Sequence, residues 1–161
     1  MFAENLEMET FYLILKYGHS YIRWIVIILI VLSIFKAFMG MKNNSVFAKD
    51  RKIFSMTMAS THLMLVIGII LFFISPGKGF EIFSEGGFMK VGMSRYWAVE
   101  HWFGMLLAIA LISRGLISTK KMNDDAKKYR RVGVSYLIGF VIIILTIVHG
   151  VKSGLEAGFL T

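Results

Sequence analysis

The sequence of 161 residues contains no cysteine and only one proline. Without cysteine, the chain forms no disulfide, no thiolate metal site and no iron–sulfur cluster. It also lacks the paired cysteines to which c-type haem is attached covalently, so any haem must be held through histidine or methionine, as b-type haem is. The single proline, Pro76, predicts largely unkinked helices and marks the expected end of the second hydrophobic segment.

Charged residues are also scarce, at 17% of the chain, whereas 57% of the residues are hydrophobic. A water-soluble domain of this size has no room to bury so much apolar surface. Spanning a bilayer as a helix takes about 20 mostly apolar residues. Four segments qualify, so we expect one domain over residues 1–161, an all-α integral membrane bundle of four helices running up-down-up-down. The predicted spans cover residues 12–35, 53–75, 96–113 and 132–151.

The net charge of +8 is distributed unevenly along the chain. Twelve bases and three acids fall between spans one and two or between spans three and four, giving +9 there and −1 elsewhere. By the positive-inside rule these two connections are cytoplasmic, and both termini and residues 77–94 lie outside. We therefore expect no nucleic-acid binding and assign the bases to topology and to contact with anionic lipid. The twelve bases are Lys36, Lys42, Lys49, Arg51, Lys52, Arg114, Lys120, Lys121, Lys127, Lys128, Arg130 and Arg131.

Each of the four histidines lies in a different predicted span: His19, His62, His101 and His149. A polar, ionisable ring at membrane depth is costly and is by default a sign of function. Imidazole is the commonest protein ligand for metals and a standard axial ligand of haem iron. The pattern therefore predicts a cofactor, held by histidines inside a membrane bundle.

The depths of the histidines favour one haem over two. With about 1.5 Å per helical residue, the distances to charged flanking residues place His19, His101 and His149 in the outer half of the membrane and His62 near its midplane. Two stacked haems would need a histidine pair at each face. We expect His19 and His101 as the axial pair, with His62 and His101 as the second choice. His149, close to the water interface, is the most dispensable.

Charged residues lie beside two of these histidines. Arg23 is one helical turn deeper than His19, and both Arg23 and Arg95 could hold haem propionates because a guanidinium suits carboxylates. Glu100 precedes His101 and could orient a ring nitrogen or relay protons. The alternative interpretation is a structural ion pair between Arg23 and Glu100 that joins spans one and three.

The sequence leaves two other kinds of function open. His19, His101 and His149 could form an outer trio that binds copper or zinc or relays protons. The chain could also be a non-catalytic subunit or assembly factor of a larger membrane complex, with its histidines used for packing. Gly150, Gly154 and Gly158 recur every four residues, a spacing that suits close helix contact and a homo-oligomer.

Short segments around three histidines resemble small four-span bacterial membrane proteins labelled cytochrome b or cytochrome-b-like. The resemblance extends over nearly the whole chain and is most specific in the RYWAVEH sequence at Arg95–His101; the other segments are Gly18–Tyr21, Thr61–Leu63 and Phe73–Pro76. It implies histidines at the positions of His19, His62 and His101 and b-type haem in the membrane. The family's fourth span often ends in proline–tryptophan, whereas this chain has His149 and Gly150, so the resemblance assigns no role to His149.

Together these features predict a membrane protein that holds b-type haem in its outer half and carries single electrons, as an oxidoreductase or an electron-transfer subunit. The expected partners are a membrane quinol or quinone and a redox protein on the extracytoplasmic side. The expected location is the bacterial inner membrane, crossed several times, with both termini extracytoplasmic.

Overall fold

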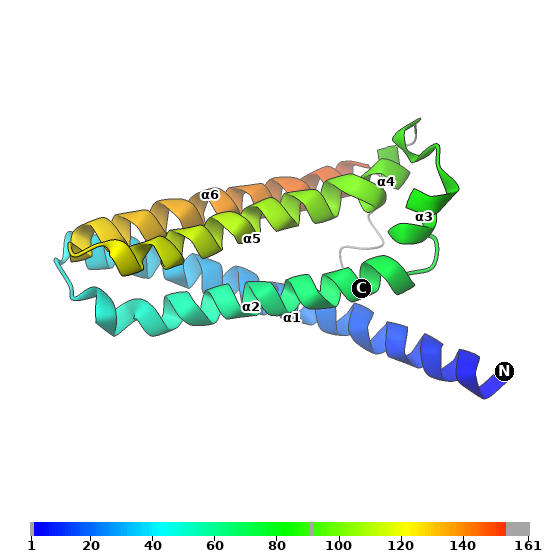
Figure 1. Ribbon diagram of the computed structural model, residues 1–161, viewed down its shortest axis with the longest axis horizontal. Coiled ribbons are helices and arrows are strands. Elements are labelled where there is room, and N and C mark those ends of the chain that lie inside the picture. Colours follow the sequence, from blue (N-terminus) through cyan, green and yellow to red (C-terminus); the bar gives the residue numbers. More distant parts are fainter. Residues whose placement is uncertain (1, 91, 154–161) are drawn as a thin grey trace.

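A computed structural model describes residues 2–90 and 92–153 of the chain. Within these ranges every regular element is a helix, and four of them are long (Figure 1). The first two are α1 (Phe2–Lys42) and α2 (Phe47–Ile74), and the last is α6 (Asp125–Lys152). All four hydrophobic segments are long and apolar enough to cross a membrane.

The third long segment is composite. It consists of α4 (Gly92–Arg95), the π-helical turn η2 (Tyr96–Glu100), α5 (His101–Ser118) and the 3₁₀ turn η3 (Thr119–Lys121). Three of the four predicted spans fall inside one of these long segments, and the second runs one residue past Ile74, so their positions are confirmed to within one residue. The observed helices are longer, because turns rich in charged residues extend them at several ends.

The second helix ends where the sequence predicted. The N–H of Ser75 closes the last turn of α2 on the carbonyl of Leu71 at 3.0 Å, and Pro76 follows. The next residues, expected as a connection, contain two short elements, α3 (Phe80–Glu85) and η1 (Phe88–Lys90). Gly79 begins this segment with a φ of +57°, and a side chain there would run into the carbonyl oxygen of Phe72. The chain therefore turns sharply against the end of α2.

The helices form a bundle that is more open at one end than at the other. Helix α6 packs along both α5 and α1, and α1 also packs on α2, whereas α2 and α5 touch over a shorter stretch. Figure 1 shows the first half of α1 diverging from the other helices. We call this the open end; it also carries α3 and α4. The opposite end, with the turns at residues 43–46 and 122–124, is the turn end.

The turn end is closed by aromatic side chains. The rings of Phe47 and Phe54 stack 5.4 Å apart, and Tyr129 meets Phe47 edge-on at 5.1 Å. The Tyr129 hydroxyl donates to Asp50 at 2.7 Å. The Asp125 carboxylate accepts from the N–H of Phe47 at 3.1 Å. These bonds hold the two basic connections side by side, so the positive charge that the sequence places in both of them gathers at one end.

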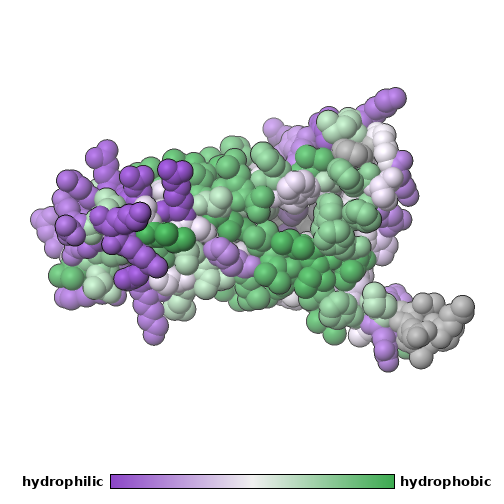
Figure 2. All heavy atoms as spheres, viewed as in Figure 1, coloured by the Kyte–Doolittle hydropathy of each residue, from purple (hydrophilic) through white to green (hydrophobic). Residues whose placement is uncertain are grey.

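The surface follows the same division. On the face in view, Figure 2 shows mainly hydrophobic residues across the middle of the bundle and hydrophilic residues at both ends. Inside the bundle, a buried hydrogen bond of 2.7 Å joins Ser33 of α1 to Thr57 of α2. Buried polar groups in such helices need partners of this kind. The two buried hydroxyl groups therefore satisfy each other within the core.

Candidate functional site: a cavity lined by two histidines

The open end contains a cavity of about 530 Å³. Its wall comes from α1, α2, α5, α6 and the turn after α2, and most of it is apolar or aromatic. This volume is in the usual range for a site that holds a small organic molecule or cofactor. Two of the four histidines, His19 of α1 and His101 at the start of α5, line it, together with Arg23.

His19 brings an unused polar atom to the cavity. Its Nδ1 is fully buried and has no hydrogen-bond partner. Gly68 of α2 faces this ring. A Cβ at Gly68 would lie 3.5 Å from the Cε1 atom of His19, so the absence of a side chain there leaves space beside the ring. Buried polar atoms are nearly always satisfied, and exceptions call for an explanation such as a ligand.

His101 is held by a tyrosine from the turn before it. The Tyr96 hydroxyl lies 3.0 Å from Nδ1 of His101, and their ring centroids are 5.5 Å apart. This contact depends on the π-helical turn η2, in which the N–H of His101 bonds to the carbonyl of Tyr96. In a regular α-helix, residues five apart point about 140° away from each other. The wider turn places Tyr96 and His101 on the same side, and this contact uses Nδ1 of His101.

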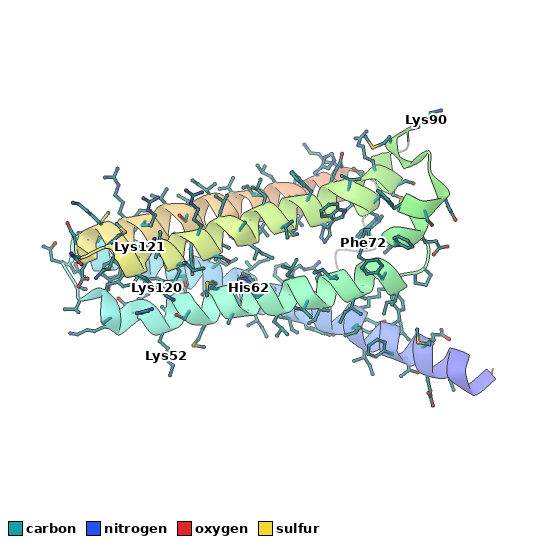
Figure 3. The ribbon with its side chains drawn as sticks, in the orientation of Figure 1. Lys52, His62, Phe72, Lys90, Lys120 and Lys121 are labelled. Atoms are coloured by element: carbon teal, nitrogen blue, oxygen red, sulfur yellow. The ribbon has the colours of Figure 1, made fainter. Side chains whose placement is uncertain are left out.

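The other two histidines lie outside the cavity. His62 is exposed on α2; its Nδ1 is 2.7 Å from the carbonyl of Met58 and its Nε2 is 3.5 Å from the hydroxyl of Ser113 (Figure 3). In Figure 3 it lies midway along α2, further from the open end than Phe72, which lines the cavity. His149 is also exposed, and its Nε2 lies 2.7 Å from the Glu100 carboxylate. Neither residue lines the cavity that His19 and His101 share.

Glu100 connects three segments at the open end. One of its oxygens bonds to Nε of Arg95 at 2.5 Å and the other to His149. Glu100 therefore pairs with Arg95 and not with Arg23, the partner that the sequence suggested as an alternative. Glu100 does orient a ring nitrogen, but that ring is His149 rather than His101. Arg95, one of the two expected propionate partners, is occupied by Glu100 and does not line the cavity, whereas Arg23 does.

Two lysines that the sequence reasoning missed also line the cavity at the open end. Lys16 lies one turn before His19, and Lys78 follows α2. The ammonium of Lys78 is 4.5 Å from the ring centroid of Trp97. Burial, and then the nearby charge of Lys16, lower the pKa of Lys78. The only sequence signal was their position near the predicted membrane edge, where lysine is ordinary.

The expected copper or zinc trio does not form. Among residues 2–90 and 92–153, no three histidine, aspartate or glutamate side chains come together in a way that could hold a metal ion. His149 is turned toward Glu100, which removes it from the set. The side-chain positions in the described residues therefore give no support to this alternative. Of the glycine series proposed for a homo-oligomer, Gly150 packs against Tyr96 of its own chain, and Gly154 and Gly158 lie outside the described residues.

The cavity residues meet the chemical needs of a non-covalently held haem. Two imidazoles come from different helices, an unpartnered nitrogen is buried at one of them, and the walls are apolar. Cations at the open end suit the carboxylates of such a group. A haem needs only two protein ligands, so the absence of a three-residue metal cluster in the described part of the chain does not conflict with it.

Comparisons with known proteins give no relative: no protein-family model, no curated protein and no solved structure matches this chain. The likeness to cytochrome-b-like proteins therefore remains an expectation based on short segments.

Proposed function

We propose that this protein is a membrane-embedded b-type haem protein that carries single electrons. The observation that supports this most is the pair His19 and His101, which reach one apolar cavity from different helices. Because the chain has no cysteine, the group is held by ligation and packing alone.

In this proposal the four long helices cross the bacterial inner membrane up-down-up-down. Both basic connections are at the turn end, where Tyr129 bonds to Asp50 and Asp125 bonds to Phe47. The positive-inside rule then puts the turn end in the cytoplasm. The cavity lies at the opposite, extracytoplasmic end, and both termini are on that side. This arrangement agrees with the predominance of charge at the turn end.

Each cavity residue has a task in this proposal. His19 and His101 would hold the haem iron, and the Tyr96 hydroxyl would accept from Nδ1–H of His101, which would fix the ring tautomer and leave Nε2 as the ligating nitrogen. The apolar walls exclude water, and the cations hold carboxylates. When bound, the haem supplies the one-electron couple, whose potential depends on these ligands, hydrogen bonds and burial.

The position of the cavity indicates the partners. A redox group in the extracytoplasmic half favours exchange with a protein on that side, and the membrane quinone pool is the natural second partner. The reaction is then electron transfer between a quinol or a redox protein and an extracytoplasmic partner, carried out alone or as a subunit of a larger complex.

A spectrum of the purified full-length protein tests this proposal. The protein is made in cells that synthesise haem, purified in detergent, and analysed by its absorbance and by its pyridine haemochrome. The proposal predicts a Soret band, split visible bands on reduction, and one haem b for each polypeptide. The His101→Ala variant, purified in parallel, should be colourless. A wild-type preparation that is folded but colourless would overturn the proposal.

A further inference from the structure

One residue of the cavity wall at the open end carries a hydrogen-bond donor without an acceptor. Nε1 of Trp97 is fully buried and has no partner, although the residue lines the cavity. Trp102, five residues later, also lines the cavity but donates its Nε1–H to the carbonyl of Ala98 at 2.6 Å. Leaving a buried donor unpaired costs about 1–3 kcal/mol. The contrast points to a ligand acceptor at Trp97.

Two cations accompany that donor. The ammonium of Lys78 lies over the Trp97 ring, and Lys16 lines the same cavity. Neither lysine forms an ion pair with a carboxylate in the described part of the chain. Burial lowers the pKa of Lys78, and repulsion by the nearby charge of Lys16 lowers it further. A bound anion would relieve this repulsion.

We propose that Trp97 Nε1, Lys78 and Lys16 form a subsite that takes the carboxylate groups of the molecule in the cavity. The indole N–H donates to a carboxylate oxygen, and the two ammonium groups pair with the negative charge. This inference rests on the proposed function, in which the molecule is haem b, whose charged groups are its two propionates. A neutral quinone ring would satisfy the indole but leave both ammonium groups unpaired.

The subsite determines the orientation of the ligand in the cavity. The acidic edge of the ligand lies at the open end beside Lys16 and Lys78, and Arg23, one turn deeper than His19, adds a third cation to the same wall. Orientation is therefore set by charge at one edge, whereas the two imidazoles alone would accept a symmetrical ring either way round. Esterifying the carboxylates removes the charge and keeps the ring, so it tests the subsite directly.

The experiment compares haem b with its dimethyl ester. The full-length protein is prepared without haem and titrated in detergent with each ligand, following the Soret band. The variants are Lys78→Gln and Trp97→Phe, and the control is Lys90→Gln, which removes an exposed lysine of η1 outside the cavity. We expect the wild-type protein to prefer free haem by roughly ten- to a hundredfold, the value of one or two charged hydrogen bonds.

Each outcome has a distinct meaning. A preference that falls in Lys78→Gln and in Trp97→Phe, and persists in Lys90→Gln, supports the subsite. Equal binding of haem and its ester by the wild-type protein overturns the subsite and leaves the proposed function standing. Binding of neither ligand overturns the proposed function itself. A loss of preference in Lys90→Gln equal to that in Lys78→Gln also overturns the subsite. General electrostatic attraction between the lysines and the propionates would then explain the preference for free haem.

Discussion

The Tyr96 hydroxyl lies 3.0 Å from Nδ1 of His101, and a π-helical turn aligns the two residues. Such turns are rare, occur mostly as single turns inside α-helices, and are frequent at functional sites. Here the turn is supported from α6, because Tyr96 packs against Gly150, where any larger residue would displace its ring. The position of His101 in the cavity therefore depends on three segments rather than on α5 alone.

Replacing Tyr96 by phenylalanine should keep the haem but change its potential. The variant loses the acceptor for Nδ1–H of His101, so the imidazole donates less electron density and the oxidised iron is stabilised less. A lost hydrogen bond of about 1 kcal/mol corresponds to a rise of roughly 40 mV for one electron. A redox titration followed by absorbance measures the shift. An unchanged potential would show that this hydrogen bond does not reach the redox group.

The same substitution at the turn end is the matched control. The Tyr136 hydroxyl donates to the carbonyl of Phe54 at 2.8 Å in the buried core, and neither residue lines the cavity. Tyr136→Phe should lower the thermal stability of the detergent-solubilised protein by about 1 kcal/mol. Its haem content and potential should equal those of the wild-type protein. A change in potential like that of Tyr96→Phe would contradict the assignment of Tyr96.

Filling the space at Gly68 should exclude the ligand. A Cβ there lies 3.5 Å from the ring of His19, so Gly68→Ala should be tolerated, whereas Gly68→Leu occupies the cavity and should reduce haem content severalfold. Gly18→Leu is the control, because a Cβ at Gly18 has no neighbour within 4 Å. Haem per polypeptide in the three purified variants checks this. Full haem content in Gly68→Leu would place the ligand elsewhere.

Removing His149 should leave the haem in place. The bond between His149 and Glu100 joins α6 to η2, and both side chains are partly exposed, at 48% and 30%. Exposed ion pairs contribute at most about 1 kcal/mol. His149→Ala should therefore lower the unfolding temperature slightly and keep full haem content. Loss of the haem in this variant would return His149 to the set of ligands.

The sequence located the helices better than it predicted which way their side chains point. Hydropathy and Pro76 located the four long helices, and His19 and His101, the expected pair, line one cavity. Direction around a helix axis depends on packing, which the sequence does not specify. On α2, Thr61 is buried and lines the cavity, whereas His62, about 100° further round the helix, is exposed.

The remaining features depend on local backbone and on tertiary contact. The π-helical turn shifts every residue from Tyr96 onward relative to a regular helix, so helical periodicity could not place Tyr96 beside His101. Lys78 reaches the cavity only because the chain turns at Gly79 against the end of α2. The sequence assigned no role to Trp97, and its unpaired Nε1 is visible only once its neighbours are known.

The haem content of single histidine variants tests the central claim most directly. The claim is that His19 and His101 bind the haem and that His62, exposed on α2, does not bind it. Pyridine haemochrome assays on the three purified alanine variants should find almost no haem in His19→Ala and His101→Ala and one haem per chain in His62→Ala. Normal haem in His19→Ala, together with loss in His62→Ala, would contradict the account.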